Sequence, residues 1–312
     1  MSCSEINAGN GSFDTPVLLL VFNRPETTIQ VFEAIRAMRP RQLFVSADGP
    51  RENPASDREN CAAVRSIVQK IDWECDVQYR FLEKNHGSRY AVAGAIDWFF
   101  SHVEQGIVLE DDCLPSPDFF IFCSAVLEHY RNDERIMHVN GTVFAAPQYP
   151  EHDVWFSRYP LVWGWASWRR AWQKYQKDLS AYPFEVLDSV FKERRARARW
   201  RELFEKVRSD APGFDNAWDF QWSATLFANS ALAISPRINL VENLGIKNGT
   251  HDISGKLYRA LPEKPCFTSG QFSRPDEISP DDYADRRLFK LIFRKSPLLL
   301  RIMKKLQNLL CR

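Results

Sequence analysis

Residues 106–112 read Gly-Ile-Val-Leu-Glu-Asp-Asp, a short apolar run that passes without a break into three acidic residues. A continuous apolar run of this length is typical of a strand covered on both faces, as in a parallel sheet. The stretch therefore predicts a buried strand over Gly106–Leu109, with Glu110, Asp111 and Asp112 at its carboxyl end. Three like charges in such a place repel one another unless a cation lies beside them.

Three further strands precede this one, and helical segments separate them. The strands are predicted at 17–22, 43–47 and 77–82, and the helices at 26–38, 57–70 and 90–103. Strands that alternate with helices in this way are typical of a doubly wound sheet. We therefore predict the α/β fold class, with a mostly parallel central sheet and helices on both faces.

Charged residues follow three of the predicted strands. Arg24 comes after the first strand, Asp48 after the second, and residues 110–112 after the fourth. In doubly wound sheets the ligand binds outside the carboxyl ends of the strands. The topology is therefore expected to bring these side chains together, although they are far apart in the sequence.

Residues 110–112, the acidic triplet, have two interpretations from the residues alone. In the first, they hold Mg²⁺ or Mn²⁺, which neutralises a bound diphosphate and stabilises its departure from a sugar. In the second, they form an acidic loop in which Asp111 or Asp112 caps the next helix. The apolar strand before the triplet and the Ser-Pro-Asp-Phe-Phe segment at 116–120 favour the metal site.

The composition argues against several classes of protein. Lys plus Arg number 41 and Asp plus Glu 40, whereas a protein that binds nucleic acid through its phosphates carries a strong basic excess. The 7 cysteines form no Cys-x-x-Cys pair, so we expect reduced thiols in a cytoplasmic protein. The N-terminal residues lack the apolar core of a signal peptide, and no run of about 18 apolar residues predicts a membrane-spanning helix.

The region from 113 to 250 has a less regular pattern. Helices are predicted at 117–130, 186–208 and 216–229, and short strands at 135–140, 154–158, 231–234 and 238–241. Trp163, Trp165 and Trp168 have a spacing that fits neither a helix nor a strand, and core packing is the simplest interpretation. Gly164, between two indoles, suggests a close approach of the backbone to a flat group such as a sugar ring.

A resemblance to a known family becomes visible at the acidic triplet. The segment Ile107-Val-Leu-Glu-Asp-Asp-Cys-Leu-Pro-Ser-Pro-Asp-Phe-Phe120 resembles the metal-binding region of N-acetylglucosaminyltransferase I and related GT-A-fold transferases. Five other segments resemble this family in the same order along the chain. They are Val21-Phe-Asn-Arg-Pro25, Val45-Ser-Ala-Asp-Gly49, Val162-Trp-Gly-Trp-Ala-Ser-Trp168, Trp218-Asp-Phe-Gln-Trp222 and Asn248-Gly-Thr-His251.

The resemblance covers about residues 16 to 255 and implies a GT-A nucleotide-diphospho-sugar transferase fold. It implies that Asp112 is the direct metal ligand, and that Glu110 and Asp111 hold the ribose and the water shell of the metal. Arg24 and Asp48 are implied to bind the phosphates and the base of the nucleotide.

The general base is implied to lie in the Trp218–Trp222 segment. The paired acids of the family are here Asp219 and Phe220, so the base is either Asp219 or the earlier Asp215. For Asp219, the alternative role is that of a hydrogen-bonded carboxylate in an aromatic core.

Three aromatic or imidazole side chains complete the candidate site. Trp165 lies in the segment that resembles the donor-sugar and acceptor region. His251 is a candidate for contact with the metal or the diphosphate, and a structural role is its alternative. His86 is a candidate for stacking on the base, although residues 80–90 match the family poorly.

These observations predict three regions: a disordered leader at 1–14, a GT-A glycosyltransferase domain at 15–255, and a C-terminal extension at 256–312. Residues 286–312 combine Leu, Ile and Phe with Lys and Arg and contain no acid. Such a basic amphipathic segment is typical of a peripheral contact with an anionic membrane surface. A helix packed on the domain is the alternative.

We therefore expect a metal-dependent, inverting glycosyltransferase that uses Mn²⁺ or Mg²⁺ and a nucleotide-sugar donor, with UDP as the expected nucleotide. The expected acceptor is a hydroxyl of a glycan or glycolipid in bacterial surface polysaccharide assembly, at the inner face of the cytoplasmic membrane. The alternatives are a sugar-nucleotide pyrophosphorylase and a non-catalytic protein that retains the fold. The pyrophosphorylase would need a Gly-rich loop after the first strand, where this chain has Asn23-Arg24-Pro25.

Overall fold

The computed structural model describes residues 13–145, 147–148, 151–247 and 271–293. Within these residues one eight-stranded sheet has the strand order β3-β2-β1-β4-β8-β6-β9-β7, and β5 pairs with β10 in a separate two-stranded sheet. The strands are β1 (Val17–Val21), β2 (Gln42–Ala47), β3 (Asp76–Phe81), β4 (Gln105–Glu110), β5 (Cys113–Pro115), β6 (Ile136–Asn140), β7 (Val154–Ser157), β8 (Trp165–Trp168), β9 (Leu232–Pro236) and β10 (Val241–Asn243).

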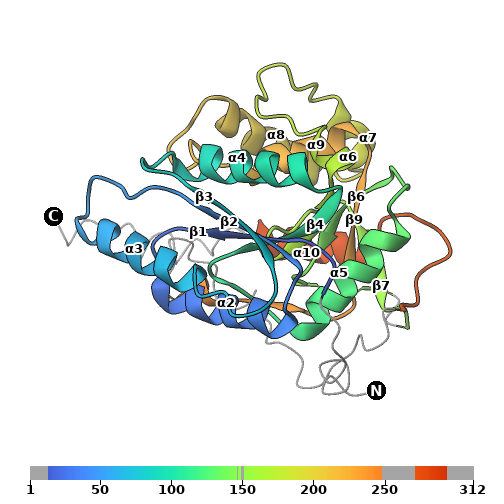
Figure 1. Cartoon of the computed structure of the whole chain (residues 1–312). Coiled ribbons are helices and arrows are strands. Elements are labelled where there is room, and N and C mark those ends of the chain that lie inside the picture. Colours follow the sequence, from blue (N-terminus) through green and yellow to red (C-terminus); the bar gives the residue numbers. More distant parts are fainter. Residues whose placement is uncertain (1–12, 146, 149–150, 248–270, 294–312) are drawn as a thin grey trace.

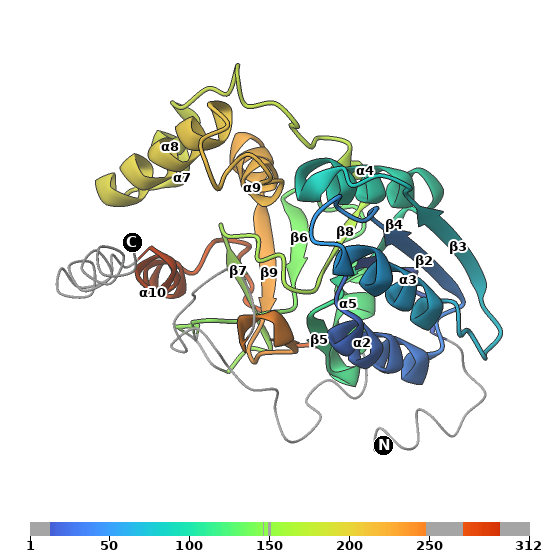
Figure 2. The ribbon, with the colours of Figure 1, turned by 90° about the vertical axis from the view of Figure 1, so that its left-hand side faces the viewer.

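In the large sheet, β7 and β8 run antiparallel to their neighbours, and the other six strands are parallel to one another. Helices cover both faces of this sheet (Figures 1 and 2). The helices are α2 (Pro25–Met38), α3 (Ser56–Val68), α4 (Gly87–His102), α5 (Pro117–His129), α6 (Arg169–Trp172), α7 (Val186–Val190), α8 (Arg194–Arg208), α9 (Asp219–Ala228), α10 (Asp282–Ile292) and the short η1 (Leu244–Lys247). The predicted α/β class and mostly parallel, doubly wound sheet are confirmed.

The two faces of β1 show why the central strands are apolar throughout. Val17, Leu19 and Val21 pack into the core under α2, α3 and α5, whereas Leu18 and Leu20 pack into the core under α4, α8 and α9. Successive side chains of a strand point to opposite faces, so a strand covered on both faces has to be apolar at every position.

The predicted elements of residues 17–110 are all present, with ends that differ by a few residues. The single helix predicted at 186–208 is wrong, because the chain becomes extended at Phe191 and Glu193 and divides α7 from α8. The strand predicted at 238–241 is also misplaced: β10 begins at Val241 and pairs with β5.

The strand β8 is a correction to the sequence analysis, which assigned no strand to the Trp-rich segment. It lies between β4 and β6 in the middle of the sheet. Gly164 has a φ of +64° and separates Trp163 from the strand, so Trp163 and Trp165 do not belong to one strand although they are two positions apart. Trp165 and Trp168 then point to opposite faces of the sheet.

The Gly164 backbone makes a close approach to protein atoms. A Cβ atom at this position would lie 2.7 Å from Cγ2 of Val241 and 3.3 Å from Cδ2 of Leu109. The glycine is therefore required by packing between β4 and β10, and the described contacts account for it without a sugar ring.

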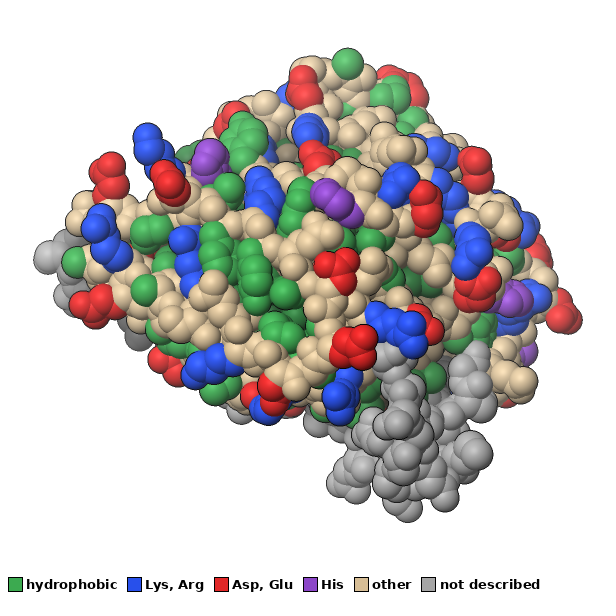
Figure 3. All heavy atoms as spheres, viewed as in Figure 1, with side chains coloured by type: hydrophobic (Ala, Val, Ile, Leu, Met, Phe, Trp, Pro, Cys, Tyr) green, Lys and Arg blue, Asp and Glu red, His purple; other side chains and the backbone are tan. Residues whose placement is uncertain are grey.

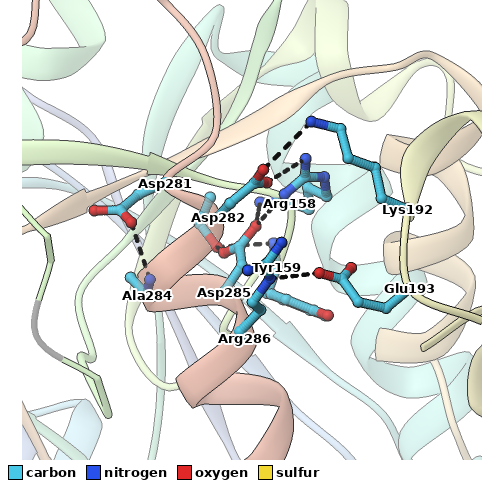
Figure 4. A network of polar contacts seen from close by, with 10 residues as sticks. Arg158, Tyr159, Lys192, Glu193, Asp281, Asp282, Ala284, Asp285 and Arg286 are labelled. Carbon is cyan, nitrogen blue, oxygen red and sulfur yellow. Dashed lines mark hydrogen bonds and ion pairs between the residues drawn. The ribbon is translucent and has the colours of Figure 1, made fainter. Parts of the chain in front are cut away.

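The C-terminal helix α10 packs on the domain through a polar network (Figure 4). Arg158 pairs with Asp282 at 2.8 Å and with Asp285 at 2.9 Å, and the latter also accepts a hydrogen bond from Ser157 Oγ at 2.6 Å. Leu288 is buried against the core under α8 and α9. Residues 286–292 of the predicted membrane-contacting segment thus belong to a helix that packs on the domain, and residues 294–312 lie outside the described residues.

The described part of the chain has no helix that is long and apolar enough to cross a membrane.

Near the N-terminus, Phe13 lies inside the predicted leader, pairs with Pro40 and packs its ring edge against Phe120. The face of the molecule in Figure 3 carries acidic and basic side chains interspersed, in keeping with the nearly balanced charge of the sequence.

Candidate active site

The site lies at the switch point of the sheet. From β1 the chain moves outward to β2 and β3, and it returns on the other side of β1 as β4. Connections that leave β1 in opposite directions open a crevice at its carboxyl end, between β1 and β4. The residues that follow β1 and β4 are those that the sequence singled out.

The acidic triplet is tied to the end of β1 by direct contacts. The Phe22 N–H donates a hydrogen bond to Asp111 Oδ2 at 3.0 Å. The Arg24 guanidinium lies 3.3 Å from Asp111 Oδ1 and forms a close ion pair with Asp112. Arg24, Asp111 and Asp112, which the sequence predicted to converge, are therefore in contact.

A third segment closes the site from the side of β10. The Leu244 N–H donates to the Asp112 carbonyl at 2.7 Å. A Cβ atom at Gly245 would lie 2.3 Å from Asp112 Oδ2 and 3.2 Å from Arg24 Nη1, so a side chain at this position would displace the ion pair. His251 lies outside the described residues, six positions after this glycine.

The acids of the triplet are poorly solvated. Burial and the neighbouring charges of Asp112 and Asp111 together raise the pKa of Glu110 to about 8, and Arg24 offsets part of the effect. Burial also raises the pKa of Asp111 to about 6, against the lowering effects of Arg24 and the Phe22 N–H. One guanidinium therefore faces three acids, and the cluster favours an added positive charge.

The donor atoms of the triplet suit a hard divalent cation. Carboxylate oxygens are the usual ligands of Mg²⁺, which is commonly held by one or two carboxylates together with water and substrate phosphates. No group of three or more His, Cys, Asp and Glu side chains among the described residues is arranged to hold a metal alone. Asp112, which is buried and faces Arg24 and Gly245, fits a site in which one or two carboxylates hold the metal together with water and substrate phosphates.

Asp219 lies at the start of the helix that covers the face to which Glu110 points. Glu110 follows Val108 by two positions and so points to the face that α9 covers. Asp219 is the first residue of α9, and its charge is close enough to contribute to the raised pKa of Glu110. Asp215 is exposed on the preceding segment. The geometry favours Asp219 over Asp215 as the acid that belongs to this site.

Asp48 holds the loop that leads into α4. Its carboxylate accepts hydrogen bonds from the Asn85 side chain at 3.0 Å, the His86 N–H at 3.0 Å and the Gly87 N–H at 3.1 Å. An anion is stabilised at this place because the N-terminal N–H groups of a helix are unpaired. The contact of Asp48 with a nucleotide base stays a prediction, while its contact with the loop is direct. His86 itself is exposed at the start of α4.

Trp165 is a core residue in this structure. Its indole is fully buried and stacks on His138, with ring centroids 5.0 Å apart, and on Trp218, with centroids 6.0 Å apart. Trp165 therefore has no exposed indole surface with which to make the predicted contact with a donor sugar. The role that the structure supports is packing against the segment that carries Asp219.

The sequence analysis missed a group that supports the end of β1. Asp57 is buried in α3, accepts a hydrogen bond from Asn23 Nδ2 at 2.6 Å and pairs with Arg51. The Arg51 guanidinium lies 5.3 Å from the ring centroid of Phe22. The sequence carries no signal for this group, because its members come from three separate segments.

No protein-family model and no curated protein matches the chain. Among solved structures it is similar to the apo form of mouse xyloside xylosyltransferase 1, with 11% sequence identity and a TM-score of 0.34. The match covers 80% of this chain and 95% of that chain. At this level of similarity, the activity of the chain has to be inferred from its own residues.

Proposed function

We propose that the protein is a metal-dependent glycosyltransferase that moves a sugar from a nucleotide diphosphate, with UDP as the nucleotide, to a hydroxyl group of an acceptor. The observation that carries the proposal is the contact of Arg24 with Asp111 and Asp112 at the switch point of the sheet, with Asp219 at the start of α9 on the face to which Glu110 points. Pyrophosphate groups need positive charge, and a hydroxyl nucleophile needs a base; this site offers both kinds of group.

Asp112 is the proposed ligand of Mn²⁺ or Mg²⁺, with Glu110 and Asp111 holding the ribose and the water shell. Bound there, the cation would neutralise the diphosphate and lower the cost of its departure. Arg24 is half exposed beside Asp112 and supplies a second positive charge at the same place. Its proposed role is to bind the diphosphate, because a guanidinium matches phosphate oxygens in geometry and charge.

Asp219 is the proposed general base. The acceptor oxygen forms a bond to the anomeric carbon while the bond from that carbon to the diphosphate oxygen breaks. The electron pair leaves with the diphosphate, and the acceptor proton passes to the Asp219 carboxylate. Attack opposite to the leaving group gives inversion at the anomeric carbon. His86 and His251 are proposed contacts of the base and of the diphosphate.

The acceptor is proposed to be a glycan or glycolipid of bacterial surface polysaccharide assembly, met at the inner face of the cytoplasmic membrane. The support is the composition of the chain after α10, where residues 294–312 are rich in Leu, Lys and Arg and contain no acid. A vesicle-binding assay with and without anionic lipid tests this part separately.

The test of the proposed function is a thermal-shift screen with UDP, GDP and TDP, each with and without Mn²⁺. A ligand at about one hundred times its dissociation constant adds roughly 2.7 kcal/mol to the free energy of unfolding, a readily measured shift. The proposal expects UDP with Mn²⁺ to give the largest shift. If no nucleotide shifts the transition, the proposal fails and a non-catalytic protein is favoured.

A further inference from the structure

Arg89, in the first turn of α4, gathers four acceptors from a segment more than a hundred residues later. Its Nε donates to the Ala217 carbonyl at 3.1 Å, and its Nη1 pairs with Asp210 at 2.6 Å. Its Nη2 lies 3.3 Å from the Phe214 carbonyl and 3.4 Å from the Val207 carbonyl. The Arg89 side chain is only 14% exposed, whereas that of Asp210 is 63% exposed, so the ion pair lies at the surface and the three carbonyl contacts are partly buried.

The segment that Arg89 holds, residues 207–217, has little regular structure after the end of α8. Asp210 and Gly213 have φ values of +47° and +84°, which neither a helix nor a strand adopts. A segment of this kind depends on side chains from elsewhere to fix its carbonyl groups. Two of the four contacts of Arg89 are with such carbonyls, those of Phe214 and Ala217, and a third is with the Val207 carbonyl in the last turn of α8.

A second contact fixes the same segment to the start of α4. A Cβ atom at Gly87 would lie 2.6 Å from Asn216 Oδ1, and the φ of this glycine is +74°. The segment therefore packs directly on the turn that Asp48 holds through the Gly87 N–H. The carboxyl end of β2 is thus connected to residues 207–217 by two direct contacts, the hydrogen bond from the Gly87 N–H to Asp48 and the packing of Gly87 against Asn216.

The held segment ends at the proposed base. Ala217, whose carbonyl accepts from Arg89, is followed by Trp218 and then by Asp219 at the start of α9. Trp218 is fixed by the core, since its indole stacks on Trp165 and its carbonyl accepts a hydrogen bond from Tyr175 at 3.0 Å. The backbone before Asp219 is therefore held from one side by the core and from the other by Arg89.

We propose that Arg89 is a positioning residue for the reaction, because it holds residues 207–217, the segment that leads into Asp219 at the start of α9. This inference rests on the proposed function, in which Asp219 is the base. A general base has to lie within hydrogen-bond reach of the proton it takes, and a displacement of about 1 Å can cost a hundredfold in rate. Loss of Arg89 is then expected to lower the rate of the chemical step and to leave nucleotide binding unchanged.

Arg169 offers a matched control at the opposite end of the parallel strands from the candidate site. Its guanidinium also contacts three backbone carbonyls, those of Phe100, Ser101 and Val103, and pairs with Glu104 at 2.5 Å. Glu104 directly precedes β4, so this arginine lies at the amino ends of the parallel strands. It has the same kind of contacts as Arg89 and none with the candidate site.

The experiment compares Arg89→Ala and Arg89→Lys with Arg169→Ala, using hydrolysis of UDP-glucose, UDP-galactose and UDP-N-acetylglucosamine with Mn²⁺. We expect Arg89→Ala to lower kcat by roughly 10- to 100-fold with the Kd of UDP within twofold of wild type, and Arg89→Lys to recover part of the loss. Arg169→Ala is expected to keep kcat within twofold. Of the two alanine variants, only Arg89→Ala should show faster backbone hydrogen exchange than wild type at residues 207–217.

Several outcomes overturn the inference. The inference fails if Arg89→Ala leaves backbone hydrogen exchange at residues 207–217 unchanged, whatever its activity. It also fails if Arg89→Ala and Arg169→Ala lose kcat to the same extent. Asp219→Asn is measured alongside: if this change lowers kcat and Arg89→Ala does not, the positioning role fails while the proposed function stands. If wild-type protein binds no nucleotide, the proposed function itself has failed.

Discussion

The acidic triplet and the α10 network each contain buried acids, Asp111 and Asp112 in the first and Asp285 in the second, but they differ in how their charge is balanced. In the α10 network Asp282 pairs with Arg158 and Lys192, and Asp285 pairs with Arg158 and Ser157 (Figure 4). In the triplet, three acids face the single guanidinium of Arg24, with Asp219 nearby.

The pKa values of Asp282 and Glu110 follow this difference, whereas for Asp285 burial outweighs the pairing with Arg158. Although burial acts to raise the pKa of Asp282, Arg158 and Lys192 outweigh it and the pKa is lowered. Burial raises the pKa of Asp285 to about 6 and that of Glu110 to about 8. Acids whose charge is balanced stabilise the fold, whereas a buried surplus of acid destabilises it and is typical of a site that binds a cation or transfers a proton.

The largest effect is expected from Asp112→Asn, which removes one charge from the triplet. Hydrolysis of UDP-sugars in the presence of Mn²⁺ should fall by about 10³-fold, because a metal ligand contributes several kcal/mol to the stabilisation of the leaving diphosphate. The matched change in the α10 network, Asp282→Asn, should leave the rate within twofold. Hydrolysis by Asp112→Asn at the wild-type rate would remove the distinction between the clusters.

Asp219→Asn tests whether the fourth acid near the triplet takes a proton. We expect kcat to fall by roughly 10²- to 10³-fold, with the Kd of UDP unchanged, because the carboxylate acts only on the nucleophile. Asp215→Asn, four residues earlier and exposed, is the control. Should Asp215→Asn show the loss instead, the base has been assigned to the wrong acid.

Arg158→Met tests the balanced cluster. Its side chain is 14% exposed and pairs with two acids, so its removal leaves a buried carboxylate without its cation. The free energy of unfolding should fall by about 3 kcal/mol, measured by urea denaturation at pH 7, with UDP binding retained. A change below about 0.5 kcal/mol, the usual range of a surface substitution, would show that the network is not structural.

Glu110→Gln is expected to have the smallest effect, one that depends on pH. A folded-state pKa of about 8, against an ordinary value of 4.5, means that folding favours the protonated carboxyl, so wild type loses stability as pH rises from 4.5 to about 8. The variant cannot ionise and should be more stable than wild type at pH 9. The full change in pKa corresponds to roughly 5 kcal/mol, and the partial exposure of Glu110 to solvent reduces this to roughly 1–2 kcal/mol. Denaturation at pH 4 and pH 9 checks this, since the difference should vanish at pH 4.

The parallel half of the sheet could be predicted from the sequence because its strands are covered on both faces. Val17–Val21 and Gln105–Glu110 read as apolar runs for that reason, and the position of Arg24 and Asp112 at carboxyl ends then follows from the topology. The antiparallel strand β8 could not be predicted, because its two indoles, Trp165 and Trp168, are three positions apart and point to opposite faces, and Trp163 precedes the strand.

The supporting contacts of the site were also beyond sequence reasoning. Asp57 meets Asn23 and Arg51, and Arg89 meets residues 207–217, only after the sheet has formed. Such contacts between distant segments have no local pattern, since a buried ion pair and a solvated charge have the same residue types.

The central claim is that the unbalanced triplet binds a nucleotide diphosphate together with a divalent cation. Calorimetric titration of UDP into the wild-type protein, with Mn²⁺ and then with EDTA, tests it most directly. We predict measurable binding with Mn²⁺ and at least a tenfold weaker affinity, about 1.4 kcal/mol, after the metal is removed. An equal affinity under both conditions, or no binding of UDP, GDP or TDP in either, would contradict the claim.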